Sequence, residues 1–453
     1  AILDNDFDFN SAGDQGGGLF LREDFAAFGG FGTQRAEIYL TDNRFNNNQS
    51  GDEGGGAYLR VAYGNLGTLE DPVKFIEAEG NQFQRNTALR SGGGLRIVAD
   101  DTVVTRLVDS EFFRNVSTQG DGGGLNISVI EGTLDINGLD ATLNDAGQGH
   151  GGGLAVAAAQ SDVSVASSYF DSNYAGDCGG GLHVSSSFQQ LGISRSVFLA
   201  NSSASCGGGL SLSSSSELAS NINFKYNAVV NNAVFGTPAP RSKIEGIASQ
   251  GGGGLFAQLA QNDSLRVSNS TVSGNQVDSN RPGGGLQFDG PMSVELKYST
   301  VVNNETDGNQ ADGAGVFNTS LSCTIGNTIL ADNVRNVSPS NELPDNLNGP
   351  AACMMASSLI SDTTNANFTD GGNNLLDIDP LLGVIADNGG ATFTHAPQPG
   401  SPVIDAGMAA DMLPLNDQRG SGFPRVFNGQ LDMGAYEVFV DAVFSDRFQN
   451  LTP

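Results

Sequence analysis

The chain has 453 residues, of which 63 are Gly and none is Trp, and its 50 acidic against 21 basic residues give a formal net charge of -29. That charge excludes nucleic acid as a partner, because the phosphate backbone would be repelled, and it disfavours an anionic membrane surface. No run of about eighteen apolar residues occurs, so the sequence predicts no transmembrane helix.

A Gly triplet followed by an apolar residue recurs along most of the chain. The copies begin 28 to 45 residues apart, a period that is typical of one coil of a β-solenoid. Helical solenoids are excluded because Gly and β-branched residues fill every segment. We therefore predict an all-β, right-handed parallel β-helix of about ten or more coils, most of roughly 28–38 residues. The triplets begin at Gly16, Gly54, Gly92, Gly122, Gly151, Gly179, Gly207, Gly252 and Gly283, with a degenerate copy at Gly313.

A second signature precedes most triplets: a small polar residue, an apolar residue two positions later, and Asn three positions after that. We expect the apolar residues to stack inward and each Asn to bond to its copies in the coils above and below while tolerating left-handed backbone angles. The coil around Leu139 departs from the pattern, and later coils have Val at the apolar position. The predicted stack contains Phe45, Phe83, Phe112, Phe170 and Phe198, and the predicted ladder contains Asn10, Asn48, Asn86, Asn115, Asn173 and Asn201.

Residues 1–15 match only the last part of a coil. We interpret the chain as a processed or truncated form, and whether Ala1 is its natural start stays open. Unpaired strand edges at an open coil would template another chain, so end-to-end assembly into filaments is one hypothesis.

The four cysteines occupy positions one coil apart. Cys178 and Cys206 each stand directly before a Gly triplet, so stacking should bring them within disulfide reach, and Cys323 and Cys353 are 30 residues apart. Disulfides imply an oxidising compartment, which predicts a protein of the extracellular space or of a bacterial cell surface.

Because each Gly triplet marks the start of a strand, the strands that follow the triplets can be aligned from coil to coil, and the residues on their outward face can be read from the sequence. Neither of its two outward columns holds carboxylates on adjacent coils, so a catalytic acid–base pair is not expected there. No motif of a serine hydrolase, zinc protease or P-loop occurs, and we predict that the chain is not an enzyme. Phe20 and Tyr58 stand on neighbouring coils of this face, where they either stack against each other or contact a sugar ring.

Metal binding is left open by the sequence. Carboxylates precede several corners and could bind Ca²⁺, but the nonapeptide of Ca²⁺-binding β-rolls is absent, and no cofactor is predicted. His150, His183 and His395 lie far apart along the chain and are interpreted as surface or packing residues.

The C-terminal third carries a series of motifs that resembles the bacterial choice-of-anchor Q domain proteins, which are right-handed β-helix proteins. The upstream repeats are similar to the GGA and FxxN motifs of polymorphic outer membrane protein adhesins, although no autotransporter barrel follows. The resemblance implies a secreted or surface protein without known catalysis, followed by a sorting signal. The motifs are NTILADN (327–333), DIDPLLGVIADN (377–388), THAPQPGSPVIDAG (394–407), DQRG (417–420) and LDMGAYE (431–437).

These observations predict a parallel β-helix over residues 1–385, a cap over residues 386–437 and a tail over residues 438–453. We expect Asp417, Arg419, Arg425 and Asp432 to pair and to close the C-terminal end of the solenoid. The leading hypothesis is a structural or adhesive extracellular protein whose partners are copies of itself, matrix or a host surface. The alternative is a polysaccharide lyase or hydrolase on the same scaffold, with polysaccharide as its partner.

Overall fold

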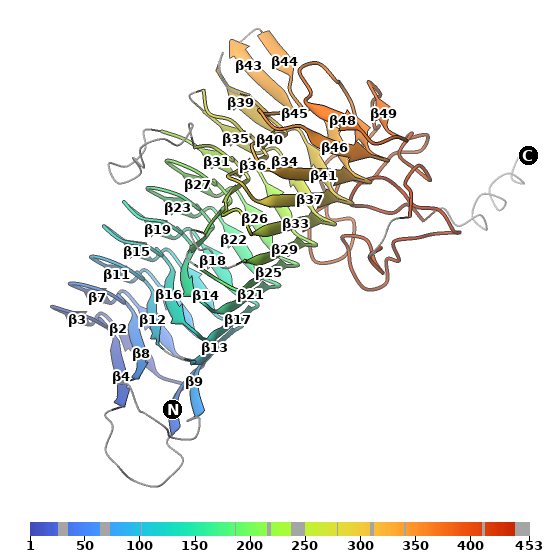
Figure 1. Cartoon of the computed structure of the whole chain (residues 1–453). Helices are drawn as coiled ribbons and strands as arrows, with labels where there is room; N and C mark the ends of the chain where they lie inside the picture. Colours follow the sequence, from blue (N-terminus) through green and yellow to red (C-terminus); the bar gives the residue numbers. More distant parts are fainter. Residues whose placement is uncertain are drawn as a thin grey trace, which may run out of the picture.

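The fold consists of stacked β-strands. The computed structural model describes residues 1–25, 35–63, 73–100, 102–185, 187–214, 219–236, 250–278, 280–308, 312–338, 341–409 and 413–439, and every regular element within these ranges is a strand. The strands form four long sheets, here called A, B, C and D, of 13, 13, 12 and 11 strands. Figure 1 shows them as one solenoid with the N-terminus near its lower end.

Each coil contributes one strand to each sheet in turn. In one coil the strands are β13 (Val104–Val108), β14 (Glu111–Phe113), β15 (Val116–Ser117) and β16 (Leu125–Ile130). They pair in parallel with β17 (Thr133–Asn137), β18 (Asp140–Thr142), β19 (Asp145–Ala146) and β20 (Leu154–Ala159) of the next coil. This repeated pairing confirms the predicted right-handed parallel β-helix.

The core fills the inside of the coils, because alternate strand residues point inward. Parallel stacking of phenylalanine rings is its most regular feature: the Phe45 and Phe83 rings lie 4.6 Å apart, and the Phe83 and Phe112 rings 4.8 Å apart. Ala141 takes the phenylalanine position between Phe112 and Phe170 and interrupts the stack. The stack resumes with Phe170 and Phe198, whose rings are 4.9 Å apart.

An asparagine ladder runs beside this stack. The Asn115 amide donates to the Asn144 side-chain oxygen at 3.0 Å and to the Phe83 carbonyl at 2.8 Å, and its own oxygen accepts from Asn86. Every ladder bond joins neighbouring coils, so each amide is satisfied inside the protein. The ladder contains Asn10, Asn48, Asn86, Asn115, Asn144, Asn173, Asn201, Asn232, Asn275, Asn304, Asn333 and Asn346.

The expectation that the ladder asparagines adopt left-handed backbone angles is wrong. The residue before each one from Asn10 to Asn333 does so, as with Asn47 (φ 54°), Arg114 (φ 54°) and Ala200 (φ 52°). The ladder side chain must remain inside the coil to bond its copies, so the chain bends one residue earlier, where a side chain can point to solvent.

The Gly triplets form the corner between sheets C and D. The first Gly of a triplet has a positive φ, such as 67° at Gly122, which glycine adopts without strain. The second has no room for a side chain, because a Cβ at Gly123 would lie 2.5 Å from the Asp145 nitrogen. The third faces the ladder, and a Cβ at Gly124 would lie 3.1 Å from the Asn144 amide carbon.

The solenoid ends with short strands and an antiparallel hairpin. The hairpin joins β43 (Val334–Ser338) to β44 (Asn341–Pro344), and it is the one antiparallel strand pair in the described ranges. The last strands are β46 (Cys353–Ala356), β47 (Leu359–Ile360), β48 (Phe368–Asp370) and β49 (Leu375–Leu376). Residues 440–453, most of the predicted tail, lie outside the described ranges.

Residues 380–409 and 413–439, here called the clasp, lie beside the solenoid (Figure 1) and pack against the outer face of sheet B. Gln418 accepts a hydrogen bond from Thr271 of β34 (Thr271–Ser273), and Ala435 donates to Thr300 of β38 (Thr300–Val302). We expected residues 386–437 to cap the C-terminal end of the solenoid. This position is wrong, because the segment contacts the side of the solenoid at β34 and β38. Many outward residues of sheet B are apolar there. Val302, Ile329 and Leu359 form a buried cluster with Val403 and Met433 of the clasp, so the clasp packs along the flank.

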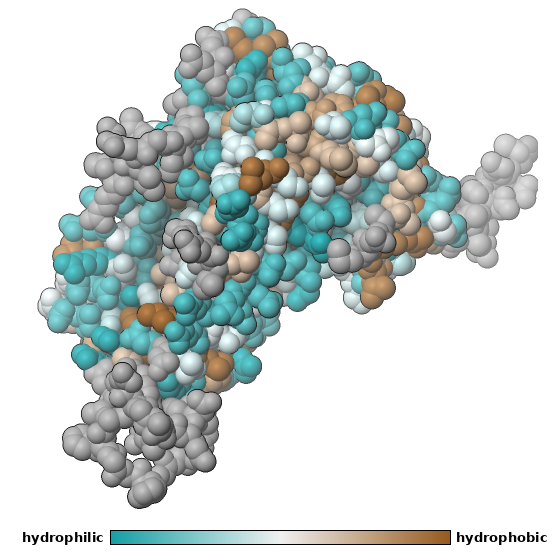
Figure 2. Space-filling model, in the orientation of Figure 1, coloured by the Kyte–Doolittle hydropathy of each residue, from teal (hydrophilic) through white to brown (hydrophobic). Residues whose placement is uncertain are grey.

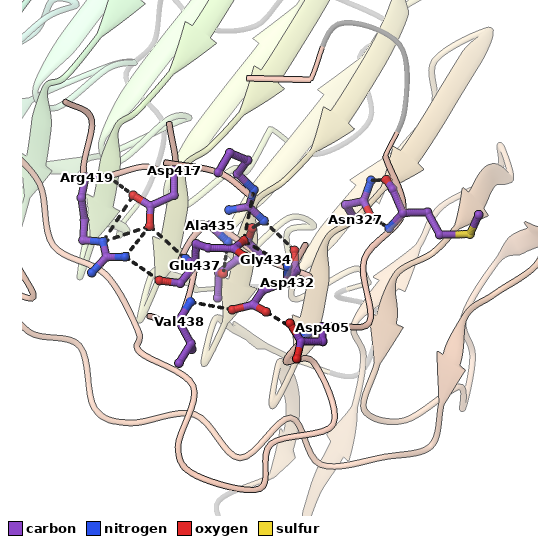
Figure 3. Close-up of polar contacts among 12 residues, drawn as sticks. Asn327, Asp405, Asp417, Arg419, Asp432, Gly434, Ala435, Glu437 and Val438 are labelled. Carbon is purple, nitrogen blue, oxygen red and sulfur yellow. Dashed lines mark hydrogen bonds and ion pairs between the residues drawn. The ribbon is translucent and has the colours of Figure 1, made fainter. Parts of the chain in front are cut away.

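Arg419 anchors the clasp internally (Figure 3). Its guanidinium donates to the Asp417 carboxylate at 2.6 Å and lies over the rings of Tyr436 and Phe423, 3.6 and 4.1 Å from their centroids. Arg419 also donates to the Glu437 carbonyl at 2.6 Å. The buried charge pair and the ring contacts therefore hold residues 417–419 against residues 436–437.

Arg425 is fully buried beside this pair and donates to the carbonyls of Asp432 and Gly434 at 2.6 and 2.8 Å. Its nearest acid is Glu437, at 4.0 Å. Burial and the Asp432 carboxylate raise the pKa of Glu437 to about 8, although Arg425 acts in the opposite direction.

Replacing Glu437 by Gln is expected to flatten the pH dependence of stability. The folded protein keeps the Glu437 proton up to about pH 8, whereas the unfolded chain releases it near pH 4.5, so stability falls as pH rises between these values. The variant should melt close to the native protein at pH 5 and about 2–5 °C above it at pH 9. Thermal melts followed by circular dichroism measure both values, and an equal shift at both pH values would contradict the assignment.

Candidate functional site

A groove runs over the outer face of sheet A. One hollow of about 500 Å³ lies over β17, β21 (Asp162–Ala166), β25 (Gln190–Ser194) and β29 (Asn221–Lys225). A second, of about 460 Å³, extends over β33 (Ser264–Ser268) and β37 (Ser293–Lys297). Gln190 and Asn223 line both hollows, so the two form one groove that crosses several coils.

The hollow results from small residues in one outward column of the sheet. Ser164, Gly192 and Asn223 follow one another in register on successive coils. A Cβ at Gly192 would meet no atom within 4 Å. Larger residues stand in the same column on either side, Asp135 before Ser164 and Arg266 after Asn223, and they bound the first hollow along the solenoid axis.

The groove is lined by hydroxyl and amide side chains that repeat from coil to coil. These groups both donate and accept hydrogen bonds, so they suit a ligand that carries many hydroxyls. Figure 2 shows a molecular face that is mostly hydrophilic, with hydrophobic residues in small separate patches. The uncharged polar residues of the lining are Thr133, Ser164, Gln190, Ser194, Asn221, Asn223, Ser264 and Ser293.

Charged side chains line both hollows of the groove. Arg266 binds Glu295 through its Nε at 2.6 Å, and Lys297 binds the same carboxylate at 3.2 Å. Burial alone would raise the pKa of Glu295, but the hydrogen bonds from Arg266 and Lys297 lower it below its usual value. The carboxylate therefore stays ionised and holds both cations in place. Asp162 and Lys225 line the other hollow, so neither charge sign dominates the groove.

The four cysteines form two disulfides between neighbouring coils. Cys178 is joined to Cys206 with a Cα–Cα distance of 4.6 Å, and Cys323 to Cys353 with a distance of 4.5 Å. Disulfides persist in oxidising compartments, which supports an extracellular protein. Among the described residues, no helix is long and apolar enough to cross a membrane.

Phe20 and Tyr58 contact each other rather than opening a platform for a sugar. Their ring centroids are 5.3 Å apart and the planes differ by 13°. Tyr58 is buried and Phe20 is 45% exposed. Both belong to sheet D, on the strands β4 (Leu19–Phe25) and β8 (Ala57–Tyr63), and neither lines the groove on sheet A.

The three histidines occupy two places. His395 is buried in the clasp, where its Nε2 pairs with the Ser273 hydroxyl at 2.9 Å and its Nδ1 donates to the Gly383 carbonyl at 2.7 Å. His150 and His183, 33 residues apart in sequence, stack with ring centroids 4.4 Å apart. Coil stacking thus joins two residues that sequence separation had suggested were distant.

The groove was missed because only the face that became sheet D was registered from the sequence. The strands of sheet A lie between a Gly triplet and the next asparagine signature. Coil lengths vary there, so the sequence does not show which residues of neighbouring coils pair. A weak signal was present, since a glycine at Gly192 interrupts an alternating strand, and such a glycine is typical of a site that another backbone or a ligand approaches.

Comparisons with known proteins leave the family open. No family model matches the chain, and no curated protein matches it either. A solved structure, the crystal structure of pectate lyase Pel9A, matches 90% of this chain and 98% of its own chain, with a TM-score of 0.40 and 14% identity. At that TM-score the likeness carries no argument about substrate or reaction. Membership of the choice-of-anchor Q or outer membrane adhesin families stays a prediction.

The prediction that the chain is not an enzyme is corrected, because a protein with a similar course of the chain is titled a pectate lyase and a scaffold of this kind therefore does not exclude catalysis. The prediction had tested two columns on sheet D alone. Sheet A holds carboxylates on adjacent coils, Asp135 on β17 and Asp162 on β21. The exclusion of catalysis is therefore withdrawn.

Proposed function

We propose that the protein is an extracellular adhesive β-helix that binds an extended polysaccharide along the outer face of sheet A. The observation that carries the proposal is the continuous groove of two hollows, of about 500 and 460 Å³, lined by hydroxyl and amide groups. The polysaccharide would belong to a surrounding matrix or to a host surface.

The repeat of the groove supports a linear polymer. Neighbouring parallel strands stand about 4.8 Å apart, which is close to the length of one pyranose unit in a chain. A polysaccharide parallel to the solenoid axis would place about one sugar over each coil. It would then meet equivalent polar groups in succession, such as Asn221, Ser264 and Ser293 in one column.

The charges support a neutral or mixed polymer. Lys225 faces the first hollow together with Asp162, and Arg266 is already held by Glu295 in the second. No described residue of the lining is aromatic, so binding would rely on hydrogen bonds repeated over several coils rather than on one stacked sugar.

Filling the groove tests the proposal. The Gly192→Trp variant should bind polysaccharide at least about tenfold more weakly, because the indole would occupy the hollow over β25. The variant should fold, since a Cβ at Gly192 meets no atom within 4 Å. Binding is measured by co-sedimentation with insoluble polysaccharides and by a glycan array.

The matched control is Gly326→Trp on β41 (Ser322–Gly326), also on sheet A but outside the groove, where a Cβ would meet its nearest atom at 3.7 Å. Equal loss in both variants, or no loss in Gly192→Trp, would contradict the proposal. The same incubations are assayed for new reducing ends and unsaturated products. Their appearance in the native protein and loss in Gly192→Trp would show that the groove also cleaves its ligand.

A further inference from the structure

A second hollow, of about 270 Å³, lies on the outer face of sheet D, away from the groove. Its floor is formed by outward residues that become small over several coils. Ala155 and Ala157 of β20 and Ser213 of β28 (Leu210–Ser213) lie there, whereas the next coil carries Phe256 and Gln258 on β32 (Leu255–Gln258). The larger side chains of Phe256 and Gln258 close the hollow at β32.

The wall of this hollow consists of residues that stand just before the Gly triplets. His150, Cys178 and Cys206 follow one another on successive coils, with the disulfide between the two cysteines. Disulfide sulfurs, alanine methyl groups and the Phe256 ring make part of the lining apolar, while Asn126 and other amide and hydroxyl groups supply hydrogen-bonding atoms.

His183 of β24 (Leu182–Ser185) is the unexplained group in this hollow. Its Nδ1 is buried and has no hydrogen-bond partner among the described residues. Burial and the neighbouring His150 lower the pKa of His183 well below its usual range, so the ring is neutral and offers one donor and one acceptor. His183 belongs to the lining of the hollow, so it adds a neutral imidazole to the polar groups there.

The geometry argues against a metal ion as that partner. His150, Asp177 and Cys178 are the one group of potential ligand residues gathered within the described ranges, but the Cys178 sulfur is in a disulfide. The Cys178 backbone N–H donates to His150 Nδ1 at 3.3 Å, which places the ring proton on Nε2, facing Asp177 at 3.6 Å. A protonated Nε2 has no lone pair for a metal.

We infer that this hollow binds one neutral pyranose ring. Its volume suits a single ring rather than a chain. The apolar part of the lining suits the C–H face of the ring, and the serine, amide and imidazole groups suit its hydroxyls. An anionic sugar is disfavoured because the lining contains Asp121 and no Lys or Arg. The inference is independent of the groove on sheet A.

The test measures binding of methyl pyranosides and methyl uronates to the whole protein by saturation-transfer NMR and calorimetry. A neutral pyranoside should bind, and Ala157→Trp should weaken it at least about tenfold, because Ala157 is exposed and the indole would fill the hollow. His183→Phe should preserve the ring stack and weaken binding by about 5–10-fold through the lost ring nitrogens.

Two controls separate this site from the rest of the surface. Val98→Trp changes the same outward column two coils away, on β12 (Leu95–Ala99), and should bind as the native protein does. Gly192→Trp fills the sheet A groove and should also leave pyranoside binding unchanged. Absence of binding by any neutral pyranoside, preference for uronates, or binding that survives Ala157→Trp would overturn the inference. Oligosaccharides ending in the bound sugar then show whether the hollow takes free sugars or chain ends.

Discussion

Replacing Asn115 by Ala is expected to lower the free energy of unfolding by about 3–6 kcal/mol. The side-chain oxygen accepts from the backbone N–H and the side-chain amide of Asn86, and its amide donates to Phe83 and Asn144. Truncation leaves the Asn86 backbone N–H buried without a partner and removes one of the two bonds that the Asn86 side-chain amide donates. Urea and thermal unfolding followed by circular dichroism measure the loss.

The matched control for Asn115 is Asn10 in the first coil. Asn10 is exposed and its amide bonds only to Asn48, so Asn10→Ala should cost less than about 1 kcal/mol. A similar cost at both positions would mean that the ladder contributes through local turn geometry instead of through cooperative bonding between coils.

Replacing Gly152 by Ala is expected to prevent folding or to leave a protein that melts far below the native one. A Cβ there would lie 2.6 Å from the Tyr174 carbonyl carbon and closer still to the carbonyl oxygens of Tyr174 and Gly180. These atoms are backbone of the next coil, held by the sheet hydrogen bonds on both sides, so they cannot move without opening the ladder. Secreted yield and far-ultraviolet circular dichroism report the effect.

Gly192→Ala provides the comparison for this corner glycine. A Cβ at Gly192 meets nothing within 4 Å, so alanine there should change the unfolding free energy by less than about 1 kcal/mol and can even stabilise. If Gly152→Ala folded as well as Gly192→Ala, the Gly triplets would not be steric requirements of the corner.

Much of the candidate surface could not be predicted, for reasons that particular residues make clear. Gly192 and Ser164 lie between the sequence markers, and only the observed pairing puts them next to each other. The rings of His150 and His183 stack because His150, at the corner before one Gly triplet, lies next to His183 on strand β24 of the following coil. Asn144 belongs to the ladder although Ala141 replaces the phenylalanine that marks the other coils. In each case the missing information was the register of neighbouring coils.

The repeats alone were enough to predict the solenoid, its inward Phe stack, its asparagine ladder and its glycine corners, because these features depend on local turn geometry and on a period that the chain repeats. Coil stacking also led to the expectation of the Cys178–Cys206 disulfide. The course of the clasp along sheet B, the groove on sheet A and the hollow on sheet D had to come from the folded molecule. They depend on which outward side chains of different coils lie together and on how much space those side chains leave, and neither quantity follows a sequence period.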